Sequence, residues 1–491
     1  MKIQKVLVAN RGEIAVRIIK TLQHMSIDSV IVYHGVDRQT PAVQMADEKI
    51  ELNADLPVAA YLDMEQIIQA CKDSGADAVH PGFGFLAENA EFARRLAAED
   101  ITFIGPSGDV IDLMGNKVRA RAFCLEHGFP IAPSVVDEGN EALFIGSAKE
   151  IGVPLLIKAA AGGGGKGMQI VRDPDQIEEA IAIARAEALR SFGSSLVYAE
   201  RFVENPRHIE VQILADKQGN VLHLGERECS IQRRFQKVIE EAPSATLTDQ
   251  QREAICSTAV NISAKAGYEN AGTVEFIYTP DGEFYFLEMN TRIQVEHPVT
   301  EMITGFDIVE QQINIADGEP LSKQQKDIEL NGHALEVRLY AEDADNDFAP
   351  AIGTLHKYQL PEKIARIENG FLEGQQVTSA FDPMLSKIIV HGENRAIAIE
   401  KMLAALEQTT VLGVTTNRDF LVRVLQHPSF AKGDTQTNFI SEHKTALQRP
   451  VLESTEFKIL LALTAMTNRD FNEGIEQLRE PHISIGCWRN L

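Results

Sequence analysis

The sequence predicts an α/β fold at the N-terminal end of the chain, built on a doubly wound parallel sheet, and mixed α+β structure after it. About the first 100 residues alternate short apolar strands with amphipathic helices, the pattern of a parallel sheet covered by helices. From residue 332 onward, short strand patterns dominate. The length of 491 residues indicates about three domains.

The N-terminal elements follow one another in a regular order. We expect strands at residues 5–9, 29–34, 76–80 and 101–104, with helices at residues 13–25, 65–72 and 88–98 between them. Ile14, Ile18 and Leu22 recur at helical spacing and give the first helix an apolar face. One long helix is then expected over residues 110–127, because Gly128 ends the helical pattern.

The middle of the chain has a different pattern. A short apolar strand at residues 154–159 leads into a run of glycines. Residues 209–214 alternate, so that His208, Glu210 and Gln212 share one face of a strand and the apolar residues share the other. Two more helices are expected, at residues 396–407 and 455–466.

Charge and cysteine content limit the function classes. Lys and Arg number 47 and Asp and Glu number 71, which gives a net charge of −24 and argues against nucleic acid or an anionic membrane as partner. No apolar run approaches the ~18 residues of a membrane span, and we expect no signal peptide at the first residues. The five cysteines are scattered without a CxxC pair, so we expect a reducing compartment, the cytoplasm.

The glycine run at residues 162–167 is the first candidate site. It matches GxGxxG, but residues 168–171 have a strand pattern, whereas a dinucleotide-binding fingerprint opens a helix. A P-loop is excluded because Gly167, and not Ser or Thr, follows Lys166. A flap between two strands remains, whose backbone N–H groups can approach phosphate oxygens. A mobile hairpin tip without a ligand is the alternative.

A hairpin over residues 273–290 supplies the second candidate. With a turn at residues 279–282, Glu275 faces Phe286 across the two strands. Five side chains then share one face of the hairpin: Glu275, Phe284, Phe286, Glu288 and Asn290. The two carboxylates and the amide oxygen are hard ligands that suit Mg²⁺. A solvated acidic face is the alternative.

The residues after this hairpin suggest an anion site. An extended backbone would place Arg292, Gln294 and Glu296 on one side, with the Arg292 fork suited to a carboxylate or carbonate and Glu296 to a general base. A surface ion pair is the alternative.

Residues 201–240 carry seven basic and six acidic residues, unlike the rest of the chain. Three of the basic ones suggest an anion pocket, with a solvated face as the alternative: Arg233, Arg234 and Lys237.

These motifs together resemble biotin carboxylase, a family of ATP-grasp enzymes, over about residues 3–445. The resemblance rests on residues 9–15 (ANRGEIA), 80–89 (HPGFGFLAEN), 103–106 (FIGP), 162–168 (GGGGKGM), 205–210 (NPRHIE), 232–234 (QRR), 288–301 (EMNTRIQVEHPVTE) and 381–384 (FDPM). It implies ATP-dependent carboxylation of biotin by bicarbonate through carboxyphosphate, with Mg²⁺ or Mn²⁺ as metal. Biotin is then a substrate attached to a carrier protein.

The resemblance also assigns roles to individual residues. Those matched to ATP binding are Lys117, Lys158, Gly163, Gly164, Gly165, Glu200, Val203, His208, Gln232, Glu275 and Glu288, and those matched to the metal are Glu275, Glu288 and Asn290. The bicarbonate site matches Lys237, Arg292, Gln294, Val295 and Glu296, and the biotin site matches Phe83 and Arg338. The implied catalytic residues are Lys237, Arg292, Glu296 and Arg338, and Arg17 matches a dimer-interface arginine.

The family pattern further implies how the chain is organised. A Rossmann-like domain is expected at residues 1–113, an ATP-grasp domain at 114–331 with a glycine-rich lid at about 131–204, a C-terminal domain at 332–445, and a helical tail at 446–491. The tail looks like the start of the linking region of acyl-CoA carboxylase α-chains. The chain is then either a trimmed α-chain or a natural subunit, since it has no Ala-Met-Lys-Met biotinylation motif.

The implied partners are a biotin carboxyl carrier protein or domain and a carboxyltransferase subunit, in a homodimer or larger complex. The final acceptor stays open among acetyl-, propionyl-, methylcrotonyl- and geranyl-CoA, pyruvate and urea. Phe83 and Phe235 depart from the family pattern, which has Tyr and His or Asn there. They leave two alternatives open: another ATP-grasp carboxylate ligase, and a nucleotide-binding subunit without turnover.

Overall fold

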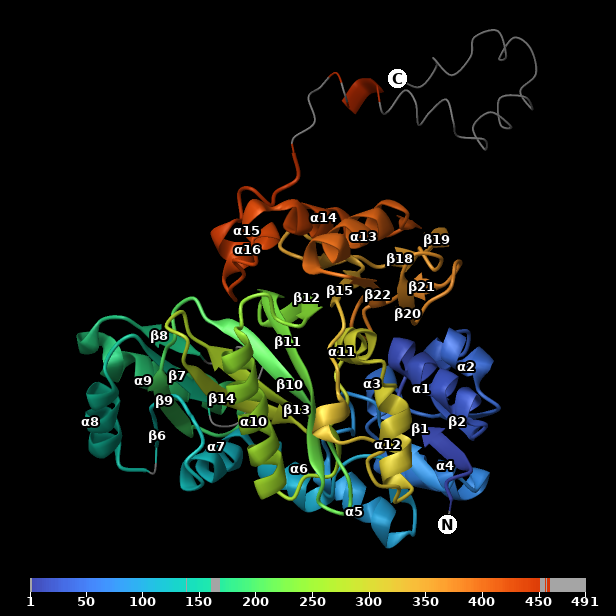
Figure 1. Ribbon diagram of the computed structural model, residues 1–491, viewed down its shortest axis with the longest axis horizontal. Coiled ribbons are helices and arrows are strands. Elements are labelled where there is room, and N and C mark those ends of the chain that lie inside the picture. Colours follow the sequence, from blue (N-terminus) through green and yellow to red (C-terminus); the bar gives the residue numbers. More distant parts are fainter. Residues whose placement is uncertain (1, 138, 160–167, 451–454, 456, 460–491) are drawn as a thin grey trace. The chain divides into compact units, whose positions relative to one another are not determined.

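The structure is a computed structural model that describes residues 2–137, 139–159, 168–450, 455 and 457–459 (Figure 1). The chain divides into two compact units, Met1–Leu447 and Gln448–Leu491. The predicted glycine flap and most of the predicted helix at residues 455–466 lie outside the described residues. None of the helices within the described ranges combines the length and apolar character of a membrane span.

The N-terminal part of the first unit is a five-stranded parallel sheet in the order β3-β2-β1-β4-β5, which confirms the doubly wound prediction. Its strands are β1 (Lys5–Val8), β2 (Asp28–His34), β3 (Glu48–Leu52), β4 (Ala78–His80) and β5 (Thr102–Phe103). The helices between them are α1 (Gly12–Met25), α2 (Pro41–Met45), α3 (Pro57–Ala60), α4 (Met64–Ser74) and α5 (Ala90–Ala98). The sequence did not indicate β3, because this edge strand is largely exposed and lacks an apolar pattern.

The predicted long helix at residues 110–127 is wrong in one respect, since two helices occupy this stretch. They are α6 (Gly108–Met114) and α7 (Lys117–Glu126). The side chain of Asn116 accepts hydrogen bonds from the N–H groups of Val118 and Arg119, each at 3.1 Å, and so caps a new helix. The break makes Lys117 the first residue of α7.

An eight-stranded sheet in the order β14-β13-β10-β11-β12-β15-β22-β20 forms the centre of the unit (Figure 1). Its strands are β10 (Arg207–Ala215), β11 (Val221–Arg233), β12 (Gln236–Ala242), β13 (Asn270–Tyr278), β14 (Phe284–Asn290), β15 (His333–Tyr340), β20 (Arg366–Asn369) and β22 (Met384–Gly392). All neighbours in this sheet are antiparallel. Helix α10 (Asp249–Lys265) packs against β11 and β10, and its apolar residues belong to the same core as those of β10.

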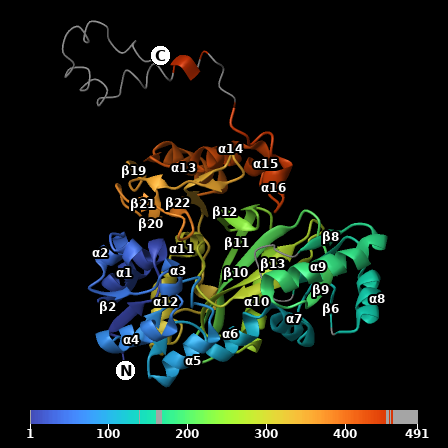
Figure 2. The ribbon, with the colours of Figure 1, turned by 180° about the vertical axis from the view of Figure 1, so that it is seen from behind.

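A smaller sheet in the order β6-β9-β7-β8 accounts for the predicted lid region, with α8 (Glu141–Ile151) and α9 (Ile177–Phe192). Its strands are β6 (Ser134–Val136), β7 (Leu155–Ala159), β8 (Gln169–Val171) and β9 (Val197–Arg201). Strands β7 and β8, which precede and follow the glycine run, pair antiparallel as the flap prediction requires. Figures 1 and 2 show this sheet and the N-terminal sheet on opposite sides of the central strands.

The remaining elements lie toward the C-terminal end of the first unit. They are α11 (His297–Thr304), α12 (Ile308–Ala316), α13 (Arg395–Glu407), α14 (Arg418–Gln426), α15 (Pro428–Ala431), α16 (Phe439–Glu442), β16 (Glu342–Asp343), β17 (Ala349–Pro350), β18 (Gly353–Thr354), β19 (Lys357–Gln359), β21 (Gln376–Val377) and β23 (Thr410–Leu412). Short strands dominate here, as predicted. Helix α13 covers β15 and β22, and both contribute to one apolar core with α14.

Candidate functional site

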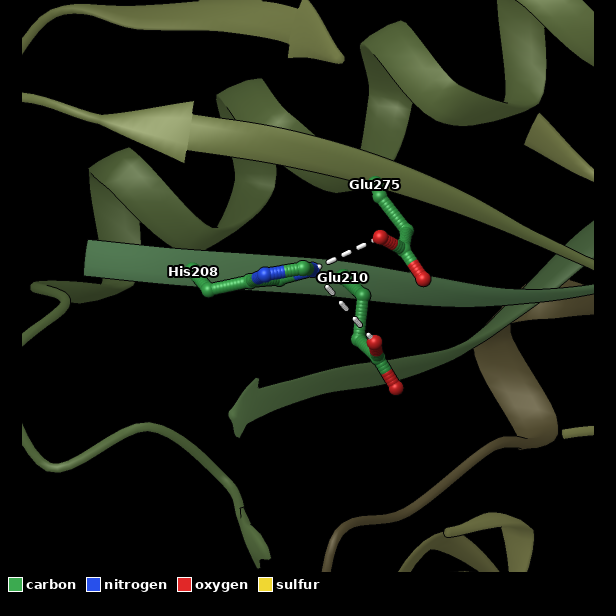
Figure 3. Close-up of side chains that lie close together, drawn as sticks. All are labelled: His208, Glu210 and Glu275. Atoms are coloured by element: carbon green, nitrogen blue, oxygen red, sulfur yellow. Dashed lines mark ion pairs between the residues drawn. The ribbon is translucent and has the colours of Figure 1, made fainter. Parts of the chain in front are cut away.

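One face of β10 carries polar side chains that are buried inside the protein. The alternation predicted for residues 209–214 is confirmed, since the odd-numbered apolar side chains belong to the core on the other face. Glu210 lies directly opposite Glu275 of the neighbouring strand β13. Figure 3 shows both carboxylates beside the ring of His208, whose Nε2 is 2.8 Å from Glu275 and 3.8 Å from Glu210. The central sheet thus carries a buried cluster of ionisable groups.

The predicted register of the β13–β14 hairpin is wrong. Glu275 lies opposite Glu288 and not opposite Phe286, which pairs with Phe276. Between these two pairs β14 has one residue more than β13. This extra residue, Leu287, forms a β-bulge. Sequence alternation alone cannot show such an insertion, because a bulge changes the face of every residue after it.

The bulge separates the phenylalanines from the carboxylates. Phe284 and Phe286 belong to the core with Phe276, so the predicted shared face is wrong for both of them. Glu288 and Asn290 are on the face of Glu275, and Asn290 Nδ2 donates to Glu275 Oε1 at 2.8 Å. The structure thus brings together the three residues predicted to hold a metal.

Lys237 of β12 lies at the centre of the buried carboxylates. Its Nζ donates to Glu210 at 2.5 Å, to Glu275 at 2.8 Å and to Glu296 at 2.6 Å. Burial alone would lower the pKa of Lys237, but the three carboxylates raise this pKa well above its usual value. Lys237 therefore stays charged and joins the predicted metal and bicarbonate sites.

Glu296 also contacts Arg338 of β15. Its Oε2 accepts from Arg338 Nη2 at 3.0 Å, and Arg338 Nε donates to Glu240 at 2.6 Å. Burial opposes ionisation of Glu296, but Lys237 and Arg338 hold its pKa well below the usual value. Glu296 is therefore ionised at neutral pH, as a general base must be. Burial raises the pKa of Glu240 to about 7 although Arg338 acts against it.

The segment before α11 is not the extended strand that we expected. Residues 291–296 bend, and the N–H of His297 donates to the carbonyl of Gln294 at 3.3 Å, which closes a turn before the helix. The side chains still converge, because Gln294 Nε2 donates to Glu275 at 2.6 Å and Arg292 Nη2 donates to Asn290 at 2.9 Å. Arg292 also pairs with Glu88 at 2.9 Å, so the segment after β4 contributes to the site.

Several of the residues predicted to bind the nucleotide are joined in polar side-chain pairs. Lys117 Nζ is 2.6 Å from Glu288, Lys158 pairs with Glu200, and His208 Nδ1 is 2.9 Å from Gln232. Burial lowers the pKa of Lys117, but Glu288 raises it by more, so Lys117 is charged. Val203 is half-buried just after β9. Gly163, Gly164 and Gly165 lie outside the described residues.

Two of the predicted basic residues lie apart from the Lys237 cluster. The two basic neighbours of Lys237 do not join its cluster, because Arg233 pairs with Glu342 and Arg234 with Asp347. The expected grouping of these three residues in one anion pocket is therefore wrong. Phe235 is 66 % exposed, whereas Phe83 is half-buried and packs against the N-terminal core. Arg17 is buried and pairs within the chain with Glu301 at 2.9 Å and Asp307 at 2.8 Å.

Sequence reasoning missed two buried cations next to this site. Arg227 is 0 % exposed and bonds to both Glu210 and Gln294. Lys387 is likewise 0 % exposed and donates to the carbonyl of Val295 at 2.5 Å. A basic residue in the interior of a predicted strand is the sequence feature that could have identified them. If such a residue is buried, its charge needs an anionic or carbonyl partner nearby.

The chemistry of the metal residues fits Mg²⁺. Glu275 and Glu288 offer hard oxygen ligands from paired positions on β13 and β14, where opposite Cβ atoms lie about 5 Å apart. Each carboxylate is paired with a lysine, Glu275 with Lys237 and Glu288 with Lys117. A divalent cation would compete with these two lysines for the carboxylate oxygens of Glu275 and Glu288.

Comparisons with known proteins agree with this architecture. Three family models match successive parts of the chain: "Biotin carboxylase, N-terminal domain" at residues 2–111, "Carbamoyl-phosphate synthase L chain, ATP binding domain" at 116–324, and "Biotin carboxylase C-terminal domain" at 336–442. The biotin carboxylase of Nostoc sp. is 46 % identical over 446 residues, which cover 90 % of this chain and 99 % of the relative. The chain belongs to the biotin carboxylase family. It is an ATP-dependent ligase.

The family also includes longer chains and solved structures. The mouse mitochondrial propionyl-CoA carboxylase alpha chain is 45 % identical over 468 residues, 94 % of this chain but only 64 % of the relative. The chain thus spans less than two thirds of that relative. The biotin carboxylase domain dimer of Hydrogenobacter thermophilus 2-oxoglutarate carboxylase, solved with MgADP, ADP and bicarbonate, has a TM-score of 0.88 at 43 % identity. That match covers 92 % of this chain and 100 % of the solved one.

Proposed function

We propose that this chain uses ATP and bicarbonate to carboxylate biotin on a carrier protein, as the biotin carboxylase component of an acyl-CoA carboxylase-type complex. One observation carries the proposal. Glu296 lies between Lys237 at 2.6 Å and Arg338 at 3.0 Å, and Lys237 also contacts Glu275. A base, an anion-binding cation and a candidate metal ligand are therefore within one connected cluster.

In the first step, Glu296 takes the proton of bicarbonate while Lys237, Arg292 and Gln294 hold its oxygens. One bicarbonate oxygen attacks the γ-phosphorus of ATP, the bond to the β–γ bridging oxygen breaks, and ADP leaves with formation of carboxyphosphate. Mg²⁺ bound by Glu275 and Glu288, with Asn290, would supply charge neutralisation on the phosphates. Lys237 and Arg338 keep Glu296 ionised at neutral pH, so its carboxylate has no proton of its own when bicarbonate binds.

In the second step, carboxyphosphate separates into CO₂ and phosphate. The phosphate takes the proton from the ureido nitrogen of biotin, and that nitrogen attacks CO₂ to give carboxybiotin. Arg338 stabilises the oxyanion that develops on the ureido oxygen. Its contacts with Glu240 and Glu296 hold the guanidinium in place before biotin arrives.

The proposed division of labour follows the predicted domains. Residues 1–113 would form the N-terminal domain, 114–331 the ATP-grasp domain with its lid, 332–445 the biotin-site domain, and 446–491 a link to the partners. The family matches at residues 2–111, 116–324 and 336–442 support this division. We propose a biotin carrier and a carboxyltransferase as partners and a homodimer as the assembly, as in the solved Hydrogenobacter domain dimer. Cytoplasmic location stays a prediction.

The test is ADP release measured with bicarbonate and free biotin added separately and together. We expect release to require bicarbonate and to rise with biotin. In the Glu296→Gln variant the rate should fall by about 10²–10⁴-fold, the usual contribution of a general base. Release without bicarbonate dependence would favour another ATP-grasp carboxylate ligase. Nucleotide binding with no ADP release would favour a non-catalytic subunit.

A further inference from the structure

Arg227 of β11 is the largest side chain with no exposure to solvent among the described residues. Its guanidinium makes five hydrogen bonds: Nε to Glu210 at 2.5 Å, Nη1 to Gln212 at 2.7 Å and Thr300 at 2.9 Å, and Nη2 to Thr273 at 3.1 Å and Gln294 at 2.7 Å. These partners come from β10, β13, the segment before α11 and α11 itself. Arg227 therefore connects the strands of the site with the residues that follow the hairpin.

The contact with Gln294 has a consequence for the direction of its amide. A guanidinium has donors and no acceptor, so the amide must turn its oxygen toward Arg227. The amide nitrogen then faces the other way, and Gln294 Nε2 donates to Glu275 Oε1 at 2.6 Å. Arg227 and Glu275 thus favour the same direction of the amide, and without Arg227 the amide oxygen would lose its donor.

This direction matters because the site has to receive an anion. An amide N–H donates to a bicarbonate oxygen, whereas an amide oxygen would repel it. Arg227 also pairs with Glu210, which is one of the three carboxylates around Lys237. One buried arginine thus fixes a donor and neutralises a carboxylate at the same time.

We propose that Arg227 is a positioning residue, which sets the Gln294 amide so that its N–H faces the bicarbonate site. The assignment rests on the proposed function, since it takes bicarbonate as the anion. Arg227 itself does not touch the substrate in this account. It acts through Gln294, and its loss therefore affects the binding of bicarbonate more than the binding of ATP.

The first test is the KM for bicarbonate in the Arg227→Lys variant, measured by ADP release. Lysine keeps the charge beside Glu210 but has no planar fork to reach Gln294 as well. We expect this KM to rise about tenfold or more, the effect of one charge-assisted hydrogen bond, while the KM for ATP stays within about threefold. The control is Thr300→Val, which removes another contact of Arg227 and should leave the KM for bicarbonate within about twofold.

A double-mutant cycle shows whether Arg227 acts through Gln294. In a Gln294→Met background, Arg227→Lys should change the KM for bicarbonate much less than it does in the unchanged chain. An equal effect in both backgrounds would overturn the proposal, and so would an unchanged KM in Arg227→Lys. Failure of the proposed function looks different, because the unchanged chain itself would then release ADP without bicarbonate or release no ADP at all.

A second variant keeps the test decisive if Arg227→Lys does not fold. In Gln294→Glu, Arg227 would hold one oxygen of the new carboxylate, and the other would face Glu275 and the anion. The KM for bicarbonate should rise about tenfold, because a carboxylate oxygen repels the anion that the amide N–H would hold, while the KM for ATP stays within about threefold. A KM for bicarbonate that does not rise in Gln294→Glu contradicts the proposal.

Discussion

Glu296 has a different cation on each of its two oxygens. Oε1 accepts from Lys237 and Oε2 from Arg338, so the base lies between the residue proposed for bicarbonate and the residue proposed for biotin. When Glu296 takes a proton, its attraction for both cations weakens. Lys237 still has Glu210 and Glu275, and Arg338 still has Glu240. The site can thus lose one carboxylate charge without leaving a cation unpaired.

The first prediction concerns Arg338→Ala. This variant should keep bicarbonate-dependent ADP release in the absence of biotin but lose carboxylation of biotin by about 10²–10³-fold, as expected when the donor to a developing oxyanion is removed. Both rates are measured on the same preparation. Equal losses of the two rates would contradict a role of Arg338 that is confined to biotin.

At the scale of residues, a site residue can be identified from the sequence when the pattern that marks it is local. Glu296 lies in a motif and Lys237 in a basic stretch that the sequence displays directly, whereas Arg338 is assigned only through the family resemblance. The structure brings all three together. Arg227 and Lys387 lie in ordinary strand patterns, and their importance comes from partners that are distant in sequence, such as Val295 for Lys387. No local pattern specifies such a partner.

At the scale of elements, the β13–β14 hairpin shows what alternation can and cannot predict. The turn and both strands follow from the sequence, because the apolar and turn residues are local. The bulge at Leu287 does not, since it is set by the packing of Phe286 against Phe276 on one side and of Glu288 against Glu275 on the other. Likewise, the break between α6 and α7 depends on the Asn116 cap inside an otherwise helical pattern.

The second prediction concerns removal of the metal from this hairpin. A chelator should abolish ADP release, and added Mg²⁺ or Mn²⁺ should restore it. The melting temperature without nucleotide should hardly change, because Lys117 and Lys237 pair with Glu288 and Glu275 when no metal is bound. Calorimetry with and without chelator checks this expectation. A large fall in melting temperature would indicate a structural metal and contradict the account.

The third prediction concerns the contact between β12, β15 and α13. Glu241 of β12 bonds to His333 of β15 at 2.8 Å and to Arg395 of α13 at 2.6 Å. Burial would raise the pKa of Glu241, but these two partners lower it from 4.5 to about 2. A lowered pKa stabilises the fold above pH 4.5, and this stabilisation is lost as the pH falls toward 2.

The Glu241→Gln variant should therefore have a lower free energy of unfolding at pH 7, by about 3 kcal/mol. The difference should stay constant down to about pH 5 and shrink below pH 4.5. Urea unfolding at several pH values measures it. The control is Glu51→Gln, which removes an exposed ion pair with Arg38 and should have little effect at any pH. A difference for Glu241→Gln that grows in acid would contradict the assignment.

At the scale of the whole molecule, the central sheet joins parts of the chain that sequence analysis assigns to different domains. Strand β12 pairs with β15, with Glu240 opposite Glu336 and Ile239 opposite Val337. The sheet therefore carries Lys237, which is proposed for bicarbonate, and Arg338, which is proposed for biotin, on neighbouring strands. The doubly wound N-terminal sheet was predictable because its strands and helices follow one another in sequence, whereas the β12–β15 pairing spans about 100 residues.

The fourth prediction concerns the second unit of the chain. Every residue proposed for the site lies in Met1–Leu447, and Leu447 is still buried in the core formed by β15, β22 and α13. A chain ending at Leu447 should keep its melting temperature, and its ADP release with free biotin should stay within about twofold of the full chain. The same assay on both chains measures this ratio. A large loss of activity would mean that residues 448–491 contribute to catalysis.

The central claim is the transfer of a carboxyl group from bicarbonate to biotin by the cluster of Lys237, Glu296 and Arg338. It is tested most directly by following radiolabelled bicarbonate into free biotin in the presence of ATP and Mg²⁺. The account predicts labelled carboxybiotin that forms only with ATP and disappears in Glu296→Gln and Arg338→Ala. ADP release that depends on bicarbonate but leaves biotin unlabelled would contradict it.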